Sequence, residues 1–140
     1  MSAPSAQTPV ILTTEMITHL RQQEYLHELT GYYHRTADFI EAAAAPVELD
    51  RDNVLDEAFR RVMGEVRAIL TDPEHKPVAT IGPSNLLFQL KKEDCRLTLL
   101  KLFKATKQSV QEKQPDATPA QVIEQSIDII MNETEDRLLK

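Results

Sequence analysis

The spacing of apolar and polar residues along the chain predicts helices. Between residues 51 and 70, apolar residues recur every four, three, four and three positions, which places them on one side of a helix. The residues of this seam are Leu55, Phe59, Val62, Val66 and Ile69. We therefore predict a helix over 51–70 that begins at Asp50 or Asp52, which are good N-caps, and ends before Pro73, which cannot continue a helix.

The N-terminal part of the chain carries an aromatic and aliphatic stripe with a seven-residue repeat. One column is Tyr25, Tyr32 and Phe39, the next is Leu26, Tyr33 and Ile40, and Leu29 lies between them. This periodicity predicts a helix over 14–45. Thr13 or Thr14 would cap its start, and Pro46 disfavours helical geometry beyond it.

The length of this first helix leaves its stripe open to two interpretations. A stripe at helical spacing is usually core, whereas aromatic residues are also enriched at interfaces. A helix of some thirty residues is a rod of about 45 Å, which is long for a domain of this size. We keep both interpretations, with core as the usual one, and in the preferred function the stripe contacts a partner protein or a second copy of the chain. The residues of this predicted contact are Tyr25, Leu29, Tyr32, Tyr33 and Phe39.

The most apolar stretch, residues 86–110, has no single apolar side. On one continuous helix, Leu86, Leu87 and Leu90 would lie opposite the later leucines. Either the helix is buried nearly all round, or the chain changes direction at residues 91–94. We favour the change of direction because Ser84 and Asp94 are both suitable N-caps. This predicts a short helix over 84–91 and a main helix over 93–113.

The last helix has the clearest local signal. Thr118, Pro119 and Gln121 combine an N-cap, a proline at the first helical position and the glutamine of a capping box. A helix over 119–138 follows. The prediction is thus an all-α bundle of four main helices and one short helix, with a long proline-containing crossover loop over 71–83. A disordered tail over 1–12 would precede a single domain over 13–140.

Composition bears on where the protein works. The one cysteine, Cys95, cannot form an intramolecular disulfide, and its leucine neighbours predict a packed thiol. The N-terminus lacks the basic region of a signal peptide, and no apolar run is long enough to cross a membrane. We expect a cytoplasmic protein that does not bind membranes.

Charge is unevenly distributed in this acidic chain of net charge −6. Residues 91–113 carry seven bases and three acids, and residues 116–140 carry six acids and two bases, so the local charges are +4 and −4. We expect these segments to be neighbours that offset each other. The alternative is a basic face over 91–107 that contacts an acidic partner or nucleic acid, although the net negative charge disfavours nucleic acid. That face would use Lys91, Lys92, Arg96, Lys101 and Lys104.

The only metal-binding pattern lies on the first helix. Glu24 and His27 have the Glu-x-x-His spacing of di-iron bundles, and His34 and Asp38 share their polar side. Such sites need this motif twice, projecting inward, and here the motif occurs once, opposite the stripe. We therefore predict a solvated polar surface with no metal and no cofactor.

No catalytic motif or phosphate-binding loop accompanies these features. The preferred function is therefore a non-enzymatic protein–protein interaction module, such as an adaptor, an assembly factor or a small regulatory subunit. The alternatives are a nucleic-acid-linked regulator that uses the basic face and a metal-binding helical enzyme built on Glu24, His27, His34 and Asp38.

Overall fold

The computed structural model describes residues 12–72, 74 and 86–139, with the backbone alone at 86 and 87. These residues form four helices, and none of them lies in a β-strand. The helices are α1 (Thr14–Ala44), α2 (Arg51–Thr71), α3 (Leu86–Lys113) and α4 (Pro119–Leu138). The predicted all-α fold class is confirmed.

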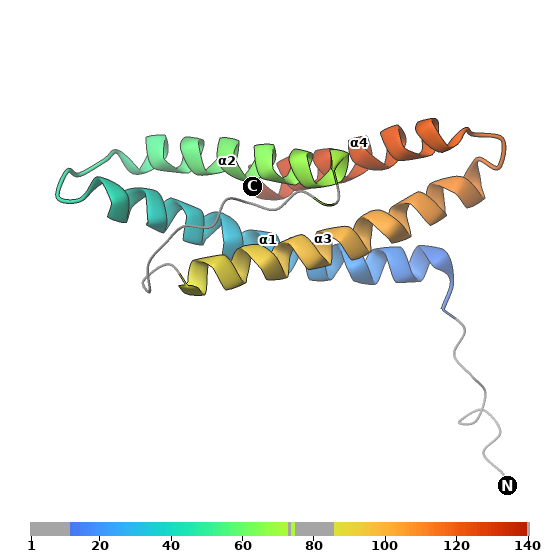
Figure 1. Ribbon diagram of the computed structural model, residues 1–140, viewed down its shortest axis with the longest axis horizontal. Coiled ribbons are helices and arrows are strands. Elements are labelled where there is room, and N and C mark those ends of the chain that lie inside the picture. The colour runs from blue at the N-terminus through green and yellow to red at the C-terminus, as the bar shows by residue number, and fades with distance from the viewer. Residues whose placement is uncertain (1–11, 73, 75–85, 140) are drawn as a thin grey trace, which may run out of the picture.

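The helices form two hairpins, α1 with α2 and α3 with α4. Figure 1 shows the long helices α1 and α3 crossing through the middle of an elongated molecule, and their mutual contact is the most extensive one. The shorter helix α2 folds back over the C-terminal half of α1, and α4 folds back over the C-terminal half of α3. Helices α2 and α4 touch each other near the middle. Each end of the molecule is therefore built from three helices.

Helix α3 is continuous where the sequence predicted a change of direction. The predictions of a break at residues 91–94 and of a separate short helix over 84–91 are wrong for the described residues, because residues 86–113 form one helix. Asp94 lies inside it, and its carbonyl oxygen accepts a hydrogen bond from the Thr98 hydroxyl at 3.2 Å. The apolar residues on two sides have different environments: Leu99 is buried, whereas Leu90 is exposed.

The predicted helix starts are confirmed at three caps. The side chain of Thr13 accepts a hydrogen bond from the Met16 amide, and that of Asp50 accepts one from the Asp52 amide. At α4, the Thr118 hydroxyl accepts from the Gln121 amide at 3.2 Å, and the Thr118 amide donates to the Gln121 side chain at 2.9 Å. Both halves of the capping box are therefore formed.

Removal of this cap should have a measurable cost. We expect Thr118→Ala to lower the free energy of unfolding by about 1 kcal/mol, because one α4 amide loses its acceptor. Gln121→Ala leaves the threonine acceptor in place and should cost less. Urea denaturation followed by circular dichroism measures both variants, and equal losses would contradict the assignment of the main capping role to Thr118.

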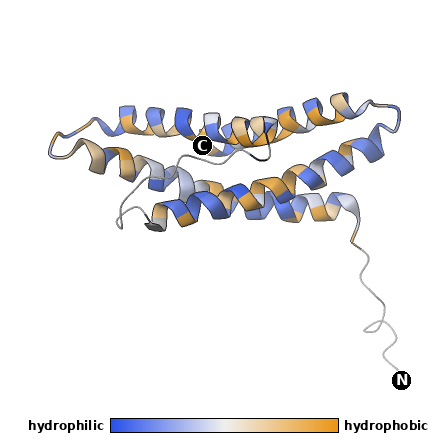
Figure 2. Ribbon diagram, in the orientation of Figure 1, coloured by the Kyte–Doolittle hydropathy of each residue, from blue (hydrophilic) through white to orange (hydrophobic). Residues whose placement is uncertain are grey.

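The core lies between the facing sides of the helices. Figure 2 shows hydrophobic and hydrophilic residues alternating along all four, as amphipathic helices require. The predicted seam of α2 is confirmed at Val62, Val66 and Ile69, which are buried. Nearer the start of α2 the buried positions are Val54 and Ala58, so Leu55 and Phe59 are only half-buried. None of the helices in the described ranges combines the length and apolarity needed to span a membrane.

Two sequence predictions fall mainly outside the described residues. The predicted tail over 1–12 has only Leu12 within them, and this residue is exposed. Of the predicted crossover over 71–83, the structure describes Thr71, Asp72 and Glu74.

Candidate functional site

The aromatic stripe of α1 lies mostly in the core, which corrects the prediction that it binds a partner. Tyr25 and Leu29 have an exposed fraction of 0 %, and Tyr32 is also buried. The physical reason is that α3 packs along α1 while α2 and α4 each cover part of it, so this long helix is covered by its own chain. These three side chains cannot reach another protein while the fold is intact.

The two remaining stripe residues are half-buried and engaged within the chain. The Phe39 ring packs on the Phe88 ring of α3 with 5.0 Å between centroids. The Tyr33 hydroxyl donates a 3.4 Å hydrogen bond to the carbonyl oxygen of Leu55 in α2. Both side chains therefore hold α1 against its neighbours.

The same side of α1 is open at its N-terminal end. Residues 15, 19, 22, 26 and 29 follow a 4-3-4-3 spacing, so they share one side of the helix. Leu26 and Leu29 are buried there, whereas Glu15, His19 and Gln22 line a groove with a volume of about 590 Å³. The buried seam of α1 thus continues into a surface groove that none of the other described helices covers.

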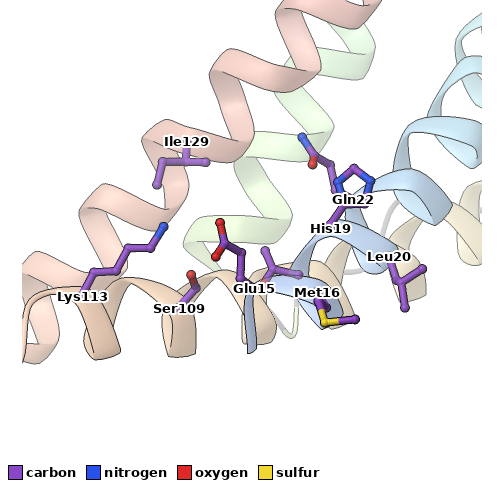
Figure 3. A pocket seen from close by; sticks show the side chains of 9 residues that line it. Glu15, Met16, His19, Leu20, Gln22, Ser109, Lys113 and Ile129 are labelled. Atoms are coloured by element: carbon purple, nitrogen blue, oxygen red, sulfur yellow. The ribbon is translucent and has the colours of Figure 1, made fainter. Parts of the chain in front are cut away.

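Three helices form this groove, as Figure 3 shows. Glu15, His19 and Gln22 come from α1, Ser109 and Lys113 come from α3, and Ile129 projects from α4 on the far side. Met16 and Leu20 lie on the α1 rim. We call this site the α1/α4 groove.

Apolar residues border the α1/α4 groove. Met16 and Leu20 line it and are 45 % and 51 % exposed, and Ile129 across the groove is 41 % exposed. Leu12, which precedes the N-cap Thr13, is 49 % exposed. Large apolar side chains with this exposure are common singly, whereas their clustering marks interaction surfaces. Leu12, Met16 and Leu20 form what we call the N-terminal stripe.

The titratable side chains of the groove are not paired with one another or with other described residues. Within the described part of the chain, Glu15, His19 and Lys113 make no side-chain hydrogen bond or ion pair. The Ser109 hydroxyl likewise bonds to none of them. The groove therefore offers separate charges of both signs on an apolar rim, with no nucleophile bonded to a general base.

Further along α1 the groove is closed by a polar contact with α4. The Gln22 side-chain amide donates a hydrogen bond to the Glu133 carboxylate. Burial raises the pKa of Glu133, and the hydrogen bond from Gln22 opposes that rise. Behind this contact, the buried Tyr25 and Thr134 hydroxyls are 2.7 Å apart. Helices α1 and α4 are therefore joined here, which fixes the inner end of the groove.

The candidate metal ligands lie on the outer side of α1. Glu24, His27, His34 and Asp38 are all exposed, and Glu24 pairs with Arg21 at 3.2 Å. In the described ranges, no three histidine, cysteine, aspartate or glutamate side chains lie close enough together to hold a metal ion.

The predicted basic face is divided by the structure. Lys101 and Lys104 are exposed, but Lys91 and Lys92 are half-buried, and Lys92 lies over the Phe88 ring. The Arg96 side chain is mostly buried and pairs with Glu93 at 2.9 Å. The five residues do not form one accessible surface. Helices α3 and α4 are neighbours, as their opposite local charges predicted.

The single cysteine is a packed residue, as predicted. Cys95 is buried in the main core cluster, and burial raises the pKa of its thiol to about 12. The thiol therefore stays protonated at neutral pH, which makes it a poor nucleophile.

Sequence reasoning did not single out the residues of the α1/α4 groove. Two signals were present: the 4-3-4-3 spacing that extends the seam back to Glu15, and the four-residue repeat of the N-terminal stripe. Comparisons of the chain with protein families, curated proteins and solved structures give no match. The functional argument therefore starts from the groove itself.

Proposed function

We propose that this protein is a non-enzymatic protein–protein interaction module whose docking site is the α1/α4 groove. The observation that supports it most is the clustering of three half-exposed apolar side chains, Met16, Leu20 and Ile129, around a groove of about 590 Å³. An apolar groove between helices is a common receptor for an amphipathic helix. The proposed docking site thus replaces the buried aromatic stripe.

The form of the groove favours a helix as its occupant. Helix α2 covers only the C-terminal half of α1. Toward the other end α4 contacts α1 at Gln22 and Tyr25 and leaves the groove open beside the first turns of α1. A helix placed there would cover Met16 and Ile129 with its apolar side. Glu15 and Lys113 would then meet residues of opposite charge at its edges.

The chemistry of the groove supports a binding role rather than catalysis. General acid–base and nucleophilic catalysis need groups held within hydrogen-bond reach of each other. His19 has no such partner among the described residues. An adaptor, an assembly factor or a small regulatory subunit working in the cytoplasm would each use a site of this kind.

Site-specific photocrosslinking tests this proposal. A benzophenone side chain at Leu20, on the groove rim, should give a discrete protein adduct in the cells that produce the chain. The same group at Gly64, which is exposed on α2 with nothing within 4 Å of an added Cβ, is the matched control. We expect an adduct from position 20 alone and its loss in the Ile129→Glu background. The absence of any adduct, or equal adducts from both positions, would overturn the proposal.

A further inference from the structure

We propose that the occupant of the α1/α4 groove is a second copy of this chain, docked about a two-fold axis. The N-terminal stripe of each copy would lie in the groove of the other. This inference rests on the proposed function, because it names the partner for the same docking site.

The first argument is that one segment supplies both parts of the contact. Residues 15–22 of α1 present Met16 and Leu20 of the N-terminal stripe and also form one wall of the groove. A two-fold interface uses the same patch on both copies, so that patch must be complementary to itself. A projecting apolar stripe beside an apolar-edged groove meets this requirement. Each copy would bury Leu12, Met16, Leu20 and Ile129, all of which are half-exposed in the single chain.

The second argument is the charge pattern of the patch. Glu15 lies on the α1 wall and Lys113 on the α3 wall, and neither has a side-chain ion pair in the described part of the chain. In the proposed dimer, Glu15 of each copy would lie near Lys113 of the other, which gives two equivalent contacts about the two-fold axis. The groove carries one formal charge of each sign, whereas the whole chain carries −6. Contact at a neutral patch keeps the repulsion between two acidic chains low.

Sedimentation equilibrium of the purified full chain, from low micromolar to hundreds of micromolar concentration, tests the inference. We expect a reversible monomer–dimer equilibrium. Met16→Glu should raise the dimer dissociation constant at least tenfold, which is about 1.4 kcal/mol. Glu48→Lys, an exposed charge reversal in the connection between α1 and α2, is the control and should leave the equilibrium unchanged.

Charge reversals test the two-fold arrangement. Glu15→Lys and Lys113→Glu should each weaken the dimer, and the double variant should recover the wild-type dissociation constant. Circular dichroism at low concentration verifies that all variants fold. Failure of the double variant to recover would overturn the proposed pairing of Glu15 with Lys113.

The outcome also separates this inference from the proposed function. A strict monomer at every concentration overturns the inference. If the crosslink from position 20 then joins a different protein, the groove is still a docking site and only its occupant was misidentified. If no crosslink forms either, both proposals fail.

Discussion

Leu29→Ala should lower the free energy of unfolding by about 3 kcal/mol. Leu29 has an exposed fraction of 0 % and belongs to the core cluster that joins α1 to the other three helices. Truncation removes apolar contacts and leaves a cavity that the surrounding helices fill only in part. Urea denaturation followed by circular dichroism gives the change from the shift in midpoint at constant slope.

Leu20→Ala is the matched control for this variant. It makes the same substitution in the same helix at a side chain that is 51 % exposed. We expect a loss below about 0.5 kcal/mol, as for most surface substitutions, when the protein is dilute enough to be monomeric. Similar losses of stability in the two variants would show that the aromatic stripe is not the core of α1.

The helix boundaries were predictable because their signals are local. The Thr118 capping box and the caps at Thr13 and Asp50 depend on residues within three positions of each other. The continuity of α3 was not predictable in this way. An N-cap such as Asp94 favours a helix start by about 1 kcal/mol, and packing of a long helix outweighs such a preference. In the fold, Cys95 and Leu99 are buried directly after it.

The burial of the aromatic stripe could not be predicted from its periodicity, because it depends on how many helices cover α1. The 31 residues of α1 exceed what one neighbouring helix of average length covers. In the fold, the 28-residue α3 packs along α1, and α2 and α4 lie toward its opposite ends, so that three helices together cover α1. How many helices cover α1 follows from this arrangement and not from the periodicity of the stripe.

The α1/α4 groove is the converse case, in which positions with the spacing of a buried seam are exposed. Glu15, His19 and Gln22 have the spacing of core positions and the polarity of surface positions. The position of α4 decides whether these residues are buried or exposed. Helix α4 contacts α1 through Glu133 and Thr134 but leaves the first turns of α1 open. The groove is formed by residues of three helices, so no single segment predicts it.

The buried hydroxyl pair between α1 and α4 supports an asymmetric prediction. Tyr25 and Thr134 are both buried, and the Thr134 hydroxyl donates its proton to the carbonyl oxygen of Ile130 at 2.8 Å. Tyr25 is therefore the donor in their 2.7 Å contact. Burial raises the pKa of Tyr25 well above its usual value, so the phenol keeps this proton in neutral and alkaline solution.

Thr134→Val should therefore cost more than Tyr25→Phe, although each change removes the same hydrogen bond. Valine leaves the Tyr25 hydroxyl buried without its acceptor, at a cost of about 2 kcal/mol, whereas phenylalanine leaves Thr134 still bonded to Ile130 and costs about 1 kcal/mol. The double variant removes both hydroxyls and should cost about 1 kcal/mol, well below the sum of the two. A double-mutant cycle of urea denaturation measures this coupling, and strictly additive losses would contradict the bond between α1 and α4.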